Sequence, residues 1–227
     1  MKKNHLVALA ISIAAIACIA LLAVKFTANS PVETTASAAD ALQDGTHYRT
    51  LSKPLATDSQ AVSVMEFFWY GCPHCRDFEP GVHEWLQSAP ENVNFELKPV
   101  AWNDATRLHA AMYFVGLKSS APEKLHSELF DLIIDMRQER NLDAQVERSS
   151  GLFAKYGIDA DSLKQSLAAA DVTAAVELSE QQMRAAEVAS TPSVLVGGRY
   201  MVLNNEAVAD FGVFNVVNAL IEKSRNQ

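Results

Sequence analysis

The chain has 227 residues, of which 49% are hydrophobic, and this is enough for one domain with a sizeable core. Its 27 acidic side chains outnumber its 19 basic ones and give a formal net charge of −8 at pH 7. This balance argues against nucleic acid as a partner, because nucleic-acid binding requires a basic surface.

The N-terminal residues form an apolar segment. Residues 6–24 contain no charged side chain and follow Lys2 and Lys3. The segment is long enough for a membrane-spanning helix, and its basic start predicts a cytoplasmic N-terminus with the rest of the chain exported. Residues 1–25 are therefore predicted to be a signal peptide or a membrane anchor.

The processing of this segment stays open between three alternatives. The small-residue site at 36–38 lies far from the apolar run for a signal peptidase, which leaves a cleaved signal and a retained anchor both possible. Lipidation at Cys18 is the third alternative. Residues 26–43 are rich in small and polar side chains and predict a flexible linker.

The folded part begins with a short edge strand at 48–51 and continues into the apolar stretch 62–70. This stretch is rich in β-branched and aromatic residues and predicts a strand buried on both faces, with Glu66 as the one acid inside it. Gly71 ends the strand. Pro73 suits a first helical position, so the chain is expected to turn from strand to helix at this point.

Cys72 and Cys75 flank Pro73 and His74 on the predicted first turn of this helix. Two cysteines three residues apart face the same way there and can form a disulfide. Cys72 projects beyond the helix end, where unpaired N–H groups and the positive end of the helix dipole lower the pKa of its thiol. His74, when protonated, adds positive charge. A dithiol stabilised in its reduced form has an oxidising disulfide.

Two other interpretations of the cysteine pair are weaker. A structural zinc site requires four ligands at recognisable spacing, and the sequence has no second cysteine pair. The remaining cysteine is Cys18, and His83, His109 and His126 are scattered along predicted helices. Redox chemistry without a metal or cofactor is therefore favoured over metal binding and over an inert structural disulfide.

The rest of the chain indicates an α/β fold with a helical insertion. The elements predicted after the helix of the cysteines are a strand at 93–100, helices throughout 103–188, strands at 193–196 and 200–203 joined as a hairpin, and a closing helix at 206–223. Two α/β blocks, residues 44–102 and 189–227, therefore bracket an insertion of residues 103–188.

Three features together resemble a known family: the sequence EFFWYGCPHC, the later STPSVLVGGRYMV, and the helical block between them. They are similar to DsbA-type thiol:disulfide oxidoreductases of the thioredoxin superfamily, over about residues 44–225. The C-P-H-C motif is typical of DsbA, whereas thioredoxins usually carry Gly-Pro between their cysteines. The resemblance implies a thioredoxin-like fold with a large helical insertion, preceded here by the apolar anchor or signal helix.

The resemblance also implies roles for individual residues. Cys72 is expected to be the exposed nucleophile, and Cys75 the buried partner that resolves the mixed disulfide. Thr191 and Pro192 match the family's cis-proline loop, where an extended substrate can pair with the backbone as an added strand. The alternative is an ordinary trans proline that begins an edge strand.

Glu66 matches a buried acid of the family. A carboxylate inside an apolar strand is costly unless it is paired, so its pKa is expected to rise. Near Cys75 it could accept the proton that this thiol loses during exchange. Lys98 on the next strand is the expected partner, and a purely structural buried pair is the alternative.

The function favoured by these residues is an exported, periplasmic oxidase that donates a disulfide between Cys72 and Cys75 to newly translocated polypeptides with free thiols. The resemblance implies reoxidation by a quinone-linked membrane protein of the DsbB type. If residues 6–24 are not cleaved, they would anchor the protein to the inner membrane. An isomerase or reductase with the same motif, and a metal-binding or chaperone-like holding module, are the alternatives.

Overall fold

The computed structural model describes residues 41–57 and 60–226, so the predicted anchor or signal segment lies outside the described part. The elements in chain order are β1 (Tyr48–Thr50), β2 (Val62–Phe68), α3 (Pro73–Leu86), β3 (Val93–Pro99), α4 (Asp104–Gly116), α5 (Pro122–Asp135), α6 (Leu142–Lys155), α7 (Ala160–Leu167), α8 (Ala170–Ala185), β4 (Ser193–Val196), β5 (Tyr200–Val202), α9 (Glu206–Phe211) and α10 (Val213–Arg225). These elements confirm the predicted α/β class.

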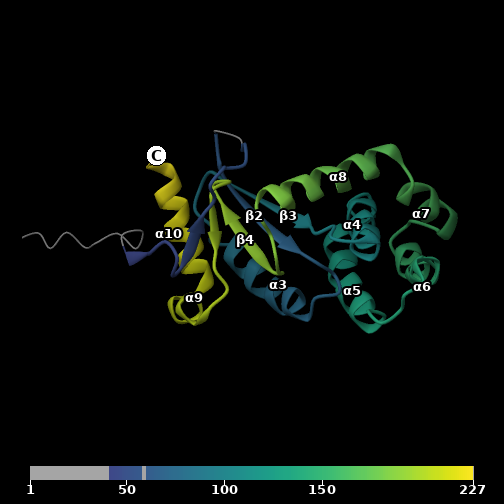
Figure 1. Ribbon diagram of the computed structural model, residues 1–227. Coiled ribbons are helices and arrows are strands. Elements are labelled where there is room, and N and C mark those ends of the chain that lie inside the picture. The colour runs from purple at the N-terminus through teal and green to yellow at the C-terminus, as the bar shows by residue number, and fades with distance from the viewer. Residues whose placement is uncertain (1–40, 58–59, 227) are drawn as a thin grey trace, which may run out of the picture. The chain divides into compact units, whose positions relative to one another are not determined.

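The described strands form one mixed sheet in the order β1-β5-β4-β2-β3 (Figure 1). β2 pairs in parallel with β3 and antiparallel with β4, and β5 pairs antiparallel with both β4 and β1. Strands from both ends of the chain therefore meet in one sheet. β2, which leads to the cysteines, has a neighbour on each side and helices on both faces.

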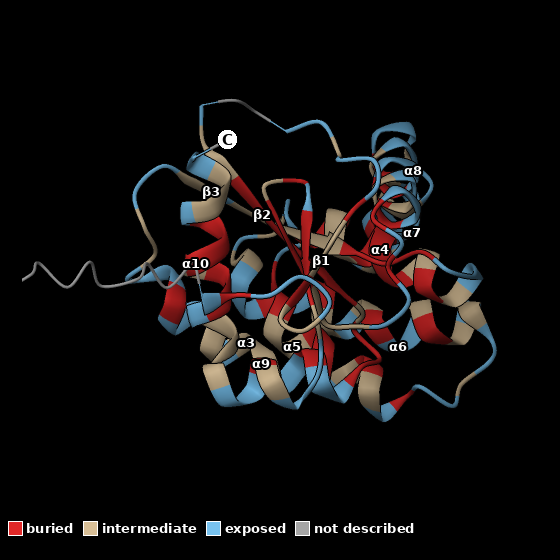
Figure 2. Ribbon diagram, turned by 60° about the vertical axis from the view of Figure 1, so that its left-hand side comes forward, coloured by how far each residue is buried: buried red, intermediate tan, exposed pale blue. Residues whose placement is uncertain are grey.

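Successive side chains of β2 face opposite sides of the sheet, as the pleat of a strand requires. Val64 packs with Trp85 of α3 and with the buried face of α10, whereas Met65 and Phe67 pack with Met183 of α8. Figure 2 shows this continuous burial along β2. The apolar run without a solvent-facing side therefore reflects a strand covered on both faces.

Helices α4 to α8 lie between β3 and β4 in the chain and pack beside the sheet (Figure 1). They share an apolar core with the end of β2, where Phe68 contacts the cluster that contains Leu129 and Ile133 of α5. α4 begins with a capping box between Asn103 and Thr106, which satisfies backbone groups at the helix end. The predicted helical insertion is confirmed as five helices, whose core continues into the end of β2 and the turn that follows it.

Two boundaries differ from the prediction. The closing helix is interrupted at Gly212, which has a φ of 88° and separates α9 from α10. At the other end, Leu42 is only 7% exposed and packs in the cluster of α10, so folded structure begins before residue 44. Among the described helices, none has the length and apolar character needed to span a bilayer.

Candidate active site

The turn from β2 to α3 places Cys72 at the N-cap of the helix. Cys72 has extended backbone angles of φ −100° and ψ 110°, and Pro73 occupies the first turn, where its missing N–H leaves no bond unmade. The Cys72 carbonyl accepts from the backbone N–H of Cys75 at 3.1 Å and of Arg76 at 3.3 Å, which begins the helix. The predicted strand-to-helix turn at the cysteines is confirmed.

Both cysteines are free thiols and both are buried, but to different degrees. Cys72 is 8% exposed and Cys75 is not exposed at all. Cys72 is thus less exposed than expected, because the loop before β4 lies against it; in the thiol form its Sγ donates a hydrogen bond to the Thr191 carbonyl at 3.3 Å. Of the two residues, only Cys72 retains any exposed surface, which suits it to be the one attacked from outside.

Hydrogen bonds at the helix end make the two thiols unequal. The pKa of Cys72 falls from 9.0 to about 5, chiefly because the Cys75 side chain hydrogen-bonds to its sulfur. Hydrogen bonds from the Thr191 side chain and from the backbone N–H groups of Cys75 and His74 add to this effect, and burial opposes it. The same bond with Cys72, and burial, raise the pKa of Cys75. At neutral pH the reduced site therefore holds a Cys72 thiolate beside a Cys75 thiol.

The loop that carries Thr191 and Pro192 meets this site from a position 119 residues further along the chain. The bond between these two residues is cis, as the resemblance implied, and β4 begins directly after it. The His74 side chain is exposed on the first turn of α3. The backbone N–H of His74 hydrogen-bonds to the Cys72 sulfur and so helps to lower the pKa of Cys72.

Glu66 lies inside β2 and is only 2% exposed. Burial, and to a lesser degree the charge of Glu79, raise its pKa from 4.5 to about 8, and its Oε2 has no hydrogen-bond partner among the described residues. The expected pairing with Lys98 is wrong. Lys98 Nζ instead forms an ion pair with Glu96 Oε2 at 2.7 Å.

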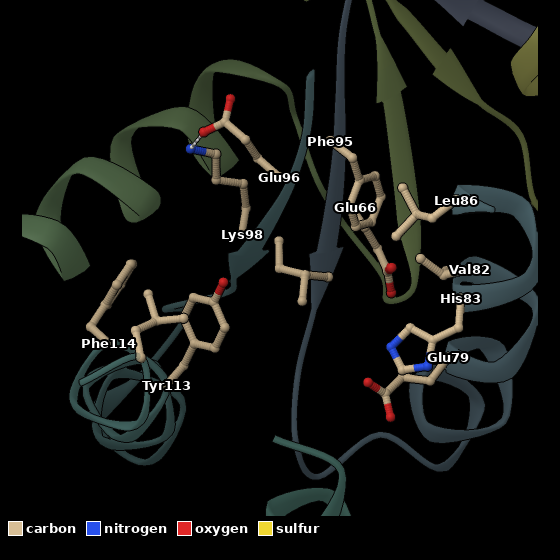
Figure 3. Close-up of a pocket in the computed structure, with 12 residues that line it drawn as sticks. Glu66, Glu79, Val82, His83, Leu86, Phe95, Glu96, Lys98, Tyr113 and Phe114 are labelled. Atoms are coloured by element: carbon tan, nitrogen blue, oxygen red, sulfur yellow. Dashed lines mark hydrogen bonds and ion pairs between the residues drawn. The ribbon is translucent and has the colours of Figure 1, made fainter. Parts of the chain in front are cut away.

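The strand register explains this correction. Glu66 is aligned with Leu97 on β3, whereas Lys98 is aligned with Phe67, so the lysine and Glu66 leave the sheet on opposite faces. Figure 3 shows Lys98 directed towards Glu96, and the Glu66 carboxyl directed towards α3. The acid therefore has no counter-ion from the neighbouring strand.

A cavity of about 430 Å³ opens between α3, β3 and α4 at the Glu66 carboxyl. Glu66, Glu79 and His83 provide polar groups on one side of its wall, and the ion pair of Glu96 with Lys98 lies on the other side (Figure 3). Burial raises the pKa of Glu79, but hydrogen bonds from His126 and Ser127 outweigh burial and hold it below its usual value. Glu79 is therefore a carboxylate anion in the wall of the cavity, and its negative charge favours the protonated form of Glu66.

The comparisons with known proteins agree with this geometry. A family model described as thioredoxin matches residues 57–211. The chain is 30% identical over 185 residues to the thiol:disulfide interchange protein DsbA of Bordetella parapertussis, covering 81% of this chain and 87% of that protein. The corresponding protein of Pseudomonas aeruginosa is 26% identical over 191 residues, covering 84% and 89%. The chain belongs to the DsbA family.

Solved structures of the family support the same assignment. The crystal structure of Pseudomonas aeruginosa DsbA has a TM-score of 0.68 at 26% identity and covers 82% of this chain and 96% of its own. This DsbA-family protein is accordingly a thiol:disulfide oxidoreductase with a thioredoxin-like fold. Within the described ranges, no group of three or more His, Cys, Asp and Glu side chains is arranged to hold a metal ion.

The sequence did not identify two histidines of this DsbA-family protein that lie next to the active-site turn. His109 of α4 and His126 of α5 are both buried, and they hydrogen-bond to Trp69 and Tyr70 respectively. Each pair is separated by at least 40 residues in the chain. No local spacing signals such contacts, because they depend on how the insertion packs against the turn.

Proposed function

We propose that the protein oxidises thiol pairs in exported polypeptides in the periplasm, using a disulfide between Cys72 and Cys75. The observation that carries this proposal is the place of Cys72 at the N-cap of α3, with its sulfur against the Thr191–Pro192 loop, an arrangement that lowers the pKa of Cys72 to about 5 and raises that of Cys75. A stabilised Cys72 thiolate favours the reduced enzyme, and so makes its disulfide a good oxidant of other thiols.

The reaction consists of two exchanges. A substrate thiolate attacks the Cys72 sulfur, the Cys72–Cys75 bond breaks, and the Cys75 sulfur leaves and takes up a proton. A second substrate thiolate then attacks the substrate sulfur of this mixed disulfide, and the Cys72 thiolate leaves. The substrate loses two electrons as its disulfide forms, and the enzyme gains them as a thiolate and a thiol.

Glu66 is the proposed proton carrier for Cys75. With a pKa of about 8 it is protonated at neutral pH and can supply the proton that the leaving Cys75 sulfur takes up. The ionised carboxylate can accept the proton again when the dithiol is reoxidised. Glu66 lies on the strand that leads into the cysteine turn, and its cavity joins it to the exposed His83.

The backbone at Thr191 and Pro192 is the proposed binding site for the substrate chain. A groove of about 310 Å³ begins at Pro192 and is lined by apolar side chains that include Phe78, Leu203 and Val208. An extended polypeptide could pair with Thr191 as an added strand and place an apolar side chain in this groove. Unfolded chains, whose apolar side chains are exposed, are the substrates that such a groove favours.

Turnover requires an oxidant for the reduced enzyme. We propose a quinone-linked membrane protein of the DsbB type for this step, and membrane attachment through residues 6–24 if that segment is retained.

The proposed domain limits are an α/β domain of residues 44–102 and 189–227 around an insertion of residues 103–188. Leu42 extends the first part of this domain slightly towards the N-terminus.

The pH dependence of alkylation tests the central step. The reduced protein should react with iodoacetamide at Cys72 with a midpoint near pH 5, and a Cys72→Ser variant should lose this reactive group. A Cys75→Ser variant should accumulate mixed disulfides with exported proteins. A midpoint near 9, together with no trapped partner, would refute the proposed oxidase.

A further inference from the structure

The two residues before Gly71 in the active-site turn each hydrogen-bond to a buried histidine of the helical insertion. Trp69 Nε1 donates to His109 Nδ1 at 2.9 Å, and the Tyr70 hydroxyl lies 2.7 Å from His126 Nδ1. Consecutive side chains of one turn are thus bonded to different helices, α4 and α5. The turn connects the central strand directly to the nucleophilic sulfur.

The chemistry of the Trp69 bond determines which nitrogen of His109 carries the proton. An indole N–H only donates, so Nδ1 must be an acceptor and Nε2 must carry the proton. Nε2 then donates to Gln145 Oε1 at 2.7 Å, and the Gln145 amide donates to the Glu139 carbonyl at 2.8 Å. Burial lowers the pKa of His109, which favours this neutral form.

The Trp69 ring is also in close contact with the turn itself. A Cβ atom at Gly71 would lie only 2.3 Å from Cζ2 of this ring, so the ring covers the backbone next to Cys72. The carbonyl of Trp69 accepts the backbone N–H of Cys72 at 2.9 Å. The ring, its histidine and the turn therefore form one packed unit.

The second bond connects the turn to α3 beyond the cysteines. His126 Nε2 lies 3.1 Å from Glu79 Oε1, and the Ser127 hydroxyl donates to Glu79 Oε2 at 3.1 Å. The His126 Nε2 contact is one of distance and charge and is not a hydrogen bond, whereas the Tyr70 hydroxyl can donate to Nδ1 whenever the ring carries its proton on Nε2. Burial raises the pKa of Tyr70, so this hydroxyl keeps its proton.

We propose that His109 and His126 are positioning residues that hold the active-site turn, through Trp69 and Tyr70, where the Cys72 sulfur meets the N–H groups of α3. The inference rests on the proposed role of Cys72 as the nucleophile. Packing alone would allow the aromatic rings to rotate and slide, whereas hydrogen bonds to buried, oriented imidazoles fix both rings. The helical insertion thereby acts on the Cys72 sulfur through the turn that carries it.

The test uses the full reduced protein, with each histidine replaced by Leu and with His109 also replaced by Asn. His109→Leu and His126→Leu remove the acceptor, whereas His109→Asn keeps an oxygen acceptor for Trp69. We expect each Leu variant to raise the midpoint of Cys72 alkylation, reducing the thiolate fraction below that midpoint about 3- to 10-fold, and to shift the equilibrium with glutathione towards the disulfide by a similar factor. His109→Asn should recover most of the wild-type midpoint.

A matched control separates positioning from stability. Ser179 of α8 is buried and donates to the Pro99 carbonyl at 2.8 Å, so Ser179→Ala should lower the unfolding temperature without moving the alkylation midpoint. Leu variants that lower stability but keep the wild-type midpoint and glutathione equilibrium would overturn the proposal.

If a Leu variant does not fold, Tyr70→Phe and Trp69→Phe decide the question: Tyr70→Phe removes only the hydroxyl, and Trp69→Phe removes the indole N–H while keeping a smaller aromatic ring. An unchanged midpoint in both variants would then overturn the proposal. The wild-type midpoint provides a separate check. If it is low and the variants match it, only the positioning role fails, whereas a wild-type midpoint near 9 would contradict the proposed function itself.

Discussion

Replacing Glu66 with Gln should stabilise the reduced protein increasingly as the pH rises. The unfolded chain loses the Glu66 proton near pH 4.5, whereas the folded protein keeps it until about pH 8. Between these values the native state binds more protons than the unfolded state, so stability falls with increasing pH. At about 1.4 kcal/mol per unit, the 2.5 units between pH 4.5 and pH 7 correspond to about 3.5 kcal/mol, of which about 3 kcal/mol is lost above pH 4.5, because the unfolded carboxyl is already half ionised there.

The neutral amide of Gln resembles the protonated carboxyl in size and does not titrate. The free energy of unfolding of Glu66→Gln should therefore equal that of the wild type near pH 4.5 and exceed it by about 3 kcal/mol at pH 7. Urea unfolding of both reduced proteins across this range measures the difference, and other titrating groups cancel because both proteins contain them.

A control and a clear refutation are available for this experiment. Glu84 is exposed on α3, so Glu84→Gln should change the unfolding free energy by less than about 0.5 kcal/mol throughout the range. A Glu66→Gln difference that is the same at pH 4.5 and pH 7 would show that the buried carboxyl is ionised in the folded protein. The proposed proton carrier would then have no proton to give at neutral pH.

Three further substitutions test local features by urea unfolding. Gly71→Ala should destabilise the protein by about 1–3 kcal/mol, because the new Cβ would displace the Trp69 ring; an unchanged midpoint would mean that the ring moves freely. Gly151→Ala, on α6 with no atom within 4 Å of the added Cβ, should stabilise by about 0.5–1 kcal/mol, and destabilisation would contradict this. Asn103→Ala should cost about 1 kcal/mol by removing the bond to the Thr106 N–H, and no cost would argue against the cap.

The elements around the cysteines were predictable because their causes are local. The apolar run of β2, the glycine that ends it and Pro73 each act within a few residues, and together they place Cys72 at the start of a helix. The helical insertion was predictable for a similar reason, since its periodic apolar positions lie within each helix. The interruption at Gly212 was missed, because apolar positions on both sides continued with helical spacing.

The partners of the site residues were less predictable. The place of Lys98 on the next strand predicts a pair with Glu66, but the register aligns Glu66 with Leu97, so the lysine leaves the strand on the other face and pairs with Glu96. Neighbouring strands alone do not define which side chains meet, because a shift of one residue exchanges the two faces. The burial of Cys72 was likewise not predictable, because the loop that covers it contains Thr191 and lies 119 residues further along the chain.

The sequence by itself therefore predicted the cysteine pair and its redox role, the helix end at Cys72, and the burial of an acid in the preceding strand. Only the tertiary structure decided that this acid has no lysine partner, that the Thr191 carbonyl meets the sulfur, and that His109 and His126 are bonded to the turn. The physical reason is the distance along the chain over which each interaction acts. Helix ends and burial patterns arise within a few residues, whereas these contacts depend on strand register and on packing between segments tens of residues apart.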